Sequence, residues 1–150
     1  MTMAGHFLVE GTGSGPVLAT APLSFWGVVD VETGRVIDRS HPALGSSVAG
    51  RVLVMPVGRG SSSSSSVLAE AIRLGTAPAA IVLSEPDPIL VVGSLVAARL
   101  YGTACPIVVL GGDDHARLTT ETWAAVTIDA TDPGRAILRS ETGRSQPTSR

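Results

Sequence analysis

Short apolar runs alternate with amphipathic stretches through the middle of the chain. The runs have the length of buried strands and cover residues 52–56, 79–83 and 106–110. Between them, apolar residues recur at helical spacing over residues 67–74 and 89–100, and Gly75 and Gly102 follow where helix C-caps belong. Asp87 and Pro88 suit the cap and first residue of the second helix. This order predicts parallel strands joined by right-handed helical crossovers.

The two ends of the chain predict additional strands. Residues 6–10 and 16–20 flank a glycine-rich turn and are expected to pair as an antiparallel hairpin. Residues 123–129 and 135–138 flank the turn sequence at 131–134, and residues 35–38 read as one more short strand. We expect residues 1–5 to be frayed and residues 141–150 to form a disordered tail. The prediction is one mixed α/β domain over residues 1–140.

Composition narrows the class of protein. A chain of 150 residues with 44% hydrophobic and 16% charged residues has the balance of one folded domain. The net charge of −2 and the lack of a basic patch disfavour nucleic-acid binding. No apolar run is long enough to span a bilayer and no signal sequence is evident, so we expect a cytoplasmic protein without membrane association. Cys105, the single cysteine, cannot form an internal disulfide or a metal site alone.

The loop after the first buried run carries the strongest candidate for chemistry. Gly58-Arg59-Gly60 is followed by six serines, of which Ser61 is the first. A helix begins nearby, and its first turn presents unpaired N–H groups and the positive end of the dipole, which favour an anion or a deprotonated hydroxyl. Ser61 is therefore the residue we assign to catalysis. The alternative is that the serines only cap the helix.

Other motifs exclude some activities and leave others open. The loop has neither the lysine of a phosphate-binding P-loop nor the third glycine of a dinucleotide fingerprint. A base for Ser61 would come by residue type from His6, His41 or His115, and sequence alone does not place any of them beside it. Trp26, in a segment broken by proline and glycine, is either core packing or the wall of a ligand pocket.

Several separate motifs, in one order, resemble the small subunit, or swivel domain, of the aconitase X enzymes. The resemblance covers approximately residues 7–140. It rests on Pro22-Leu23-Ser24-Phe25-Trp26-Gly27, Asp30, Ile37-Asp38, His41-Pro42, Ser47-Val48-Ala49-Gly50, Gly58-Arg59-Gly60-Ser61, Gly75-Thr76-Ala77-Pro78 with the run to Leu83, and Glu85-Pro86-Asp87. In two places the chain departs from the family pattern: Val28 stands where a glycine is usual, and the serine run replaces more varied residues with a glycine near position 64.

The resemblance implies a swivelling β/β/α domain with a mixed sheet or open barrel and two crossover helices. It also implies a hydro-lyase that is active only with a large subunit, which carries an iron–sulfur cluster and most of the active site. Known members dehydrate cis-3-hydroxy-L-proline or mevalonate 5-phosphate. We favour the first substrate because the lysine-free composition, rich in Ala, Val and Arg, is more typical of a high-GC bacterium than of an archaeon.

The resemblance also assigns roles to residues. It implies that Ser61 is the proton acceptor. The expected substrate-binding residues are Arg59, Gly60, Ser62, Phe25, Trp26 and His41. No residue of this chain is expected to bind metal by itself, although a contribution of Cys105 to a shared cluster remains an alternative to a role as a small core residue. Besides the phosphomevalonate dehydratase alternative, a stand-alone binding or regulatory module remains open.

Overall fold

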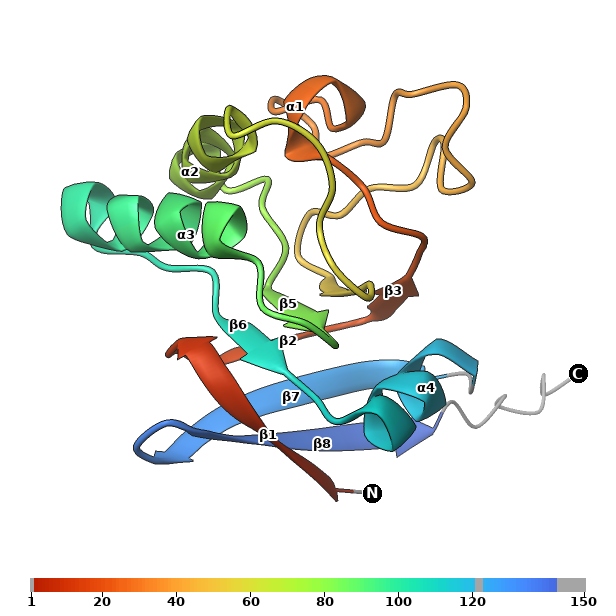
Figure 1. Cartoon of the computed structure of the whole chain (residues 1–150), viewed down its shortest axis with the longest axis vertical. Coiled ribbons are helices and arrows are strands. Elements are labelled where there is room, and N and C mark those ends of the chain that lie inside the picture. The colour runs from red at the N-terminus through yellow and green to blue at the C-terminus, as the bar shows by residue number, and fades with distance from the viewer. Residues whose placement is uncertain (1, 121–122, 143–150) are drawn as a thin grey trace, which may run out of the picture.

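The predicted alternation of strands and helices forms the centre of the computed structural model, which describes residues 2–120 and 123–142. It comprises β4 (Val52–Val54), α2 (Ser64–Leu74), β5 (Ala80–Leu83), α3 (Pro88–Tyr101) and β6 (Ile107–Val109). The three strands are parallel, and the two helices lie side by side over one face of the sheet (Figure 1). Gly75 and Gly102 end the helices in the left-handed conformation, as predicted.

Strands from both ends of the chain extend this unit into an eight-stranded sheet with the order β2-β7-β8-β1-β6-β5-β4-β3. The added strands are β1 (Thr2–Val9), β2 (Gly13–Gly15), β3 (Val17–Ala19), β7 (Trp123–Asp132) and β8 (Arg135–Thr142). Strand β2 also contacts β4, and β3 contacts β7, so the two edges of the sheet approach each other. The result is a nearly closed barrel with helices α1 (Phe25–Val28), α2 and α3 on one side. The mixed α/β prediction is confirmed.

Alternation along the central strands builds two hydrophobic cores. In β4, Leu53 points to the helices, whereas Val52 and Val54 point into the barrel. In β5, Ile81 and Leu83 lie in the helix-side core. All these side chains are fully buried, which explains why the strands read as continuous apolar runs. Short α4 (Gly112–Thr120), which the polar sequence did not predict, closes the barrel core with Leu118.

The structure corrects the expectations for the N-terminal region. Residues 6–10 and 16–20 do not form a hairpin: β1 pairs with β6 and β8, and β3 pairs in parallel with β4. Thr2–Gly5, expected to be frayed, pair with β8. Residues 35–38 do not form a strand, and of these residues Arg35 and Val36 form isolated bridges, with Ser47 and Val29 respectively. The interrupted helix α1 lies in a segment expected to be a loop.

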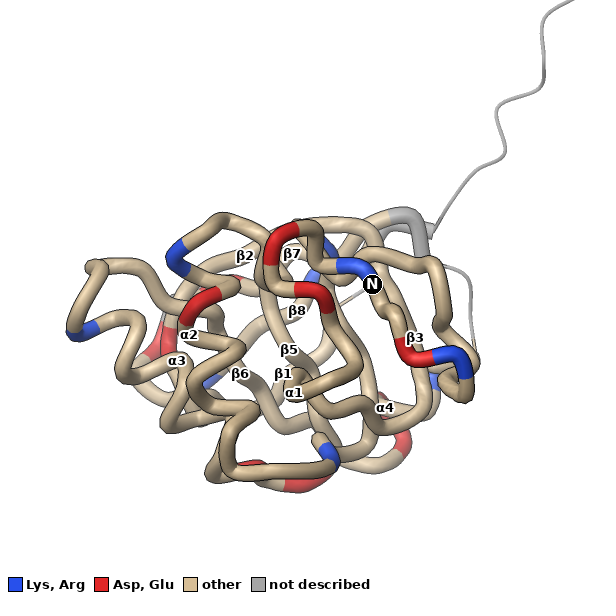
Figure 2. The backbone as a smooth tube through the Cα atoms, turned by 90° about the horizontal axis from the view of Figure 1, so that it is seen from above, with Lys and Arg blue, Asp and Glu red and all other residues tan. Residues whose placement is uncertain are grey.

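The C-terminal strand extends further than predicted. Strand β8 continues to Thr142, and residues 143–150 of the expected tail lie outside the described residues. Within the described part of the chain, no helix combines the length and apolar character needed to cross a bilayer. Acidic and basic residues are interspersed over the molecule (Figure 2).

Candidate functional site

The loop between β4 and α2 passes so close to neighbouring side chains that two of its positions have room only for glycine. Gly60 has a φ of +99°, and a Cβ there would collide with the Ser24 side chain. A Cβ on Gly58 would collide with Oδ2 of Asp87. The two glycines therefore bring the loop between the start of α1 and the start of α3, with Ser61 directly after it.

Ser61 lies one turn ahead of α2. The helix begins at Ser64, three residues earlier than expected, and the backbone N–H of Ser64 donates to the Ser61 carbonyl at 3.0 Å. The Ser61 Oγ accepts a hydrogen bond from the Ser63 N–H at 3.1 Å. The N-cap of α2 is Ser63, which makes no side-chain cap hydrogen bond, so the capping alternative is not confirmed. The hydrogen bond between Ser63 and Ser61 lies ahead of the helix. It leaves the exposed Ser61 hydroxyl its own proton and a second lone pair for a ligand.

Ser64 has a different role from its neighbours in the serine run. It is buried, and its Oγ lies 2.9 Å from the Ser24 Oγ and accepts the Trp26 N–H at 3.2 Å. These bonds tie the start of α1 to the start of α2. Sequence reasoning missed this contact, although one signal was present: Ser64 precedes the buried Leu68 by one helical turn.

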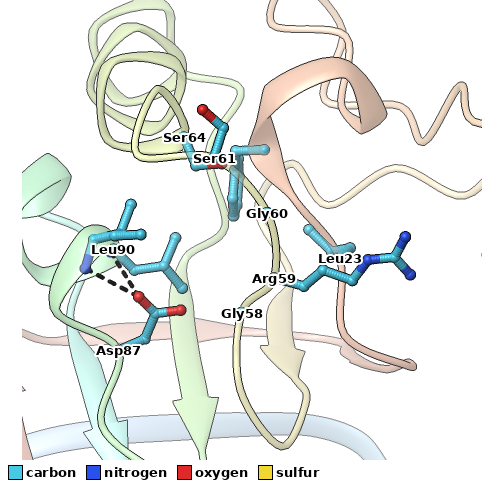
Figure 3. Close-up of a pocket in the computed structure, with 10 residues that line it drawn as sticks. Leu23, Gly58, Arg59, Gly60, Ser61, Ser64, Asp87 and Leu90 are labelled. Carbon is cyan, nitrogen blue, oxygen red and sulfur yellow. Dashed lines mark hydrogen bonds between the residues drawn. The ribbon is translucent and has the colours of Figure 1, made fainter.

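Asp87 approaches the glycine loop from α3. Its Oδ1 accepts the N–H groups of Ile89 at 3.0 Å and Leu90 at 3.3 Å, which confirms the predicted cap. Its Oδ2 turns toward Gly58 (Figure 3). The side chain is buried, so a carboxylate predicted only as a cap also forms part of the wall facing the loop.

A cavity of about 80 Å³ lies where these elements meet (Figure 3). Its lining residues come from three elements and the glycine loop: Leu23, Phe25, Gly58, Arg59, Gly60, Ser61, Ser64, Asp87, Ile89 and Leu90. Ligand pockets commonly enclose roughly 300–1,000 Å³. This cavity is therefore too small to enclose a substrate by itself.

The predicted substrate-binding residues fall into two groups. Phe25, Arg59 and Gly60 line the cavity with Ser61. Ser62 instead lines a neighbouring groove, and Trp26 is 59% exposed outside the cavity lining. The roles of all these residues in binding stay predictions.

Arg59 lines the cavity, but its charged end extends beyond it, and His41 is outside the cavity lining. The Arg59 guanidinium extends past Leu23 (Figure 3). Hydrogen bonds from Ser40 lower the pKa of Asp38, with smaller effects from the charges of His41 and Arg59. The buried His41 ring accepts the Ala43 N–H at Nδ1, 3.0 Å away, and its Nε2 lies 3.3 Å from the Pro22 carbonyl. These contacts indicate that His41 holds the loop.

The other candidate bases are also outside the cavity. His115 is buried, with its Nε2 3.0 Å from the Met55 carbonyl. His6 is exposed on β1, where it is paired with Val109 and Arg135. The fold therefore does not bring any of the three histidines into the cavity lining around Ser61.

The described residues do not contain a group of three or more His, Cys, Asp and Glu side chains arranged to bind a metal ion. Cys105 lies in the core, and burial raises the pKa of its thiol to about 12. Because the thiolate is the form that binds metal, this environment disfavours ligation. The residues present do not fit an iron–sulfur cluster.

The fold and the glycine–serine loop define the class of protein, a swivel-type α/β domain. A profile described as the aconitase X swivel domain matches residues 2–133, and the chain belongs to this family. The crystal structure of aconitase X from Thermococcus kodakaraensis superposes with a TM-score of 0.75 at 31% identity, covering 93% of this chain and 98% of that one.

Two curated relatives connect the family to enzymes. The chain is 50% identical over 78% of its length to a cis-3-hydroxy-L-proline dehydratase from Pseudomonas aeruginosa, of which it spans 20%. It is 49% identical over 59% of its length to the small subunit of a phosphomevalonate dehydratase from Methanothermobacter thermautotrophicus, of which the match covers 68%. The chain thus corresponds to one fifth of the first relative and to much of a separate subunit in the second.

Proposed function

We propose that this chain is the swivel part of a hydro-lyase that dehydrates a hydroxy acid, with Ser61 as the proton acceptor. The observation that carries the proposal is the position of Ser61. It stands on a loop shaped by Gly58 and Gly60, in the lining of a cavity and one turn ahead of the N-terminus of α2. Membership of the aconitase X swivel family supports the reaction class.

The surroundings of Ser61 suit proton abstraction. The Ser63 N–H donates to the Ser61 Oγ, and a hydrogen bond to an oxygen favours its negatively charged form. The positive end of α2 acts in the same direction. In the reaction, the deprotonated Ser61 Oγ takes a proton from a substrate carbon and becomes a hydroxyl, the electron pair of that C–H bond forms the double bond, and hydroxide leaves the neighbouring carbon.

The small cavity implies that a larger partner, the aconitase X large subunit or its equivalent in a fused chain, completes the site. We assign to that partner the groups that assist departure of the hydroxyl group. The iron–sulfur cluster that the family resemblance implies is also assigned to it. Among substrates we favour cis-3-hydroxy-L-proline, because the Pseudomonas aeruginosa relative of that name is 50% identical over 118 residues, whereas the Methanothermobacter thermautotrophicus subunit reaches a similar identity, 49%, over 89 residues. We place the assembled enzyme in the cytoplasm.

The test is reconstitution with the larger aconitase X chain of the same organism. Turnover of cis-3-hydroxy-L-proline is compared for wild type, Ser61→Ala and the matched control Ser66→Ala, whose exposed serine lies within α2 outside the cavity lining. We expect Ser61→Ala to lower kcat by about 100-fold or more with the complex intact, and Ser66→Ala to leave it unchanged. Unchanged turnover in Ser61→Ala would refute the base assignment.

The second candidate function is that of a phosphomevalonate dehydratase small subunit, supported by the 49% identity over the aligned region. Mevalonate 5-phosphate is the discriminating substrate in the same assay. Preferential turnover of mevalonate 5-phosphate would replace cis-3-hydroxy-L-proline as the proposed substrate. If an intact complex turns over neither substrate, a binding or regulatory module is favoured.

A further inference from the structure

Helix α3 is apolar on the side that faces away from the protein as well as on the side that packs against it. Its inner residues Leu90, Gly93 and Ala97 are buried against the rest of the fold. Its outer face carries a row of apolar residues at helical spacing, here named the α3 stripe: Ile89, Val92, Leu95, Val96 and Leu100. Leu95 is 51% exposed and Leu100 is 65% exposed. A helix that is apolar all round is normally covered on every side.

Helices α2 and α4 do not share this property. The outer face of α2 carries an ion pair between Glu70 and Arg73 at 2.5 Å. Helix α4 presents Asp113 and Asp114 in its first turn. By contrast, Arg99 is the one charged residue of α3. The stripe is therefore a local feature of one helix and not a general property of this surface.

The stripe begins at the rim of the proposed active site. Ile89 lines both the Ser61 cavity and a shallow apolar groove of about 220 Å³. That groove is bounded by Ser62 and Ser65 from the start of α2 and by Pro88, Ile89 and Val92 from α3. An object lying on the stripe would thus be in position to form the missing wall over Ser61.

We propose that the α3 stripe is the surface on which the larger part of the aconitase X enzyme docks, through an apolar face of its own. The identity of this occupant rests on the proposed function. It is supported by the relatives, in which the matching segment is one fifth of a longer chain or a small subunit. A second copy of this chain is the competing occupant, and the experiment below distinguishes it from the larger chain.

The experiment measures binding and not turnover. Affinity of the larger chain, measured by calorimetry, is compared for wild type, Val92→Lys, Leu95→Lys and the matched control Leu74→Lys, which changes an exposed leucine at the end of α2. We expect at least a tenfold loss of affinity for the two α3 variants and less than a twofold change for the control. Circular dichroism melting of each variant alone verifies folding, since these side chains are already half exposed.

A second measurement needs no substitution. Hydroxyl-radical footprinting of the wild-type complex is expected to protect Leu95 and Leu100 but not Leu74. Unchanged affinity of both α3 variants, equal losses in all three variants, or an unprotected stripe would overturn the proposal. A homodimer of this chain that Leu95→Lys dissolves without weakening heteromer formation would overturn it too. Ser61→Ala is expected to bind normally, so failure of the base assignment remains separate from failure of the docking surface.

Discussion

The hydroxyl groups of Ser24 and Ser64 lie 2.9 Å apart in the protein interior and join the first turns of α1 and α2. The same Ser64 Oγ accepts the backbone N–H of Trp26. Since the loop carrying Ser61 runs directly into Ser64, this contact sets where the proposed base stands relative to α1. The contact also shows that one member of a serine homopolymer has a specific structural role.

Ser64→Ala is expected to destabilise the domain more than the equivalent change elsewhere in the run. It leaves the Ser24 hydroxyl and the Trp26 N–H without their partner, and unsatisfied buried polar groups cost about 1–3 kcal/mol. Urea denaturation measures the free energy of unfolding. The exposed Ser66→Ala is the matched control, expected to change stability by less than about 0.5 kcal/mol. Equal effects of the two substitutions would contradict the role of Ser64.

Gly60→Ala is expected to disturb the active loop. Its φ of +99° is strained for any residue with a Cβ, and the added methyl group would meet the Ser24 side chain. We expect a loss of more than about 1 kcal/mol of unfolding free energy. Gly111→Ala is the control, since a Cβ there meets open space and its φ is not positive. A Gly60→Ala protein as stable as Gly111→Ala would show that the loop relaxes easily.

Asp87→Ala is expected to destabilise the start of α3. It removes the acceptor for the Ile89 and Leu90 N–H groups, at a cost of about 1 kcal/mol. Asp87→Asn, whose side-chain oxygen can still accept, should retain most of that stability. Thermal unfolding of the two variants distinguishes them, and similar losses for both would assign the effect to the charge instead of the cap.

Cys105 is expected to resist alkylation in the folded protein at pH 8. Burial raises the pKa of its thiol from 9.0 to about 12, so the folded state holds the proton where the unfolded state releases it. The resulting stability is complete below pH 9.0 and is lost as pH rises toward 12. Above pH 9.0, the free energy of unfolding of wild type should therefore fall by at most about 1.4 kcal/mol per pH unit relative to that of Cys105→Ala.

Labelling with iodoacetamide, with and without urea, measures the accessibility of the thiol. Parallel urea titrations at several pH values measure how the free energy of unfolding changes with pH. Rapid modification under native conditions, or identical pH slopes for wild type and Cys105→Ala, would place the thiol in contact with solvent.

Local chemistry by itself determined the central part of this protein. Apolar runs, helical spacing and cap residues such as Asp87 and Gly75 act over a few residues, so β4, α2, β5, α3 and β6 were predictable. The glycine loop marked Ser61 for the same reason. Family motifs extended this to the fold class, because their order covers most of the chain.

Only the tertiary structure decided which distant segments meet. Strand β1 pairs with β6 and β8 and not with its neighbour, because closing the barrel satisfies edges that a hairpin would leave open. Ser64 is buried and Ser66 exposed, since the phase of α2 against the core distinguishes residues that are chemically identical. His41 is held in its loop by contacts with Pro22 and Ala43 that depend on the packed position of the ring.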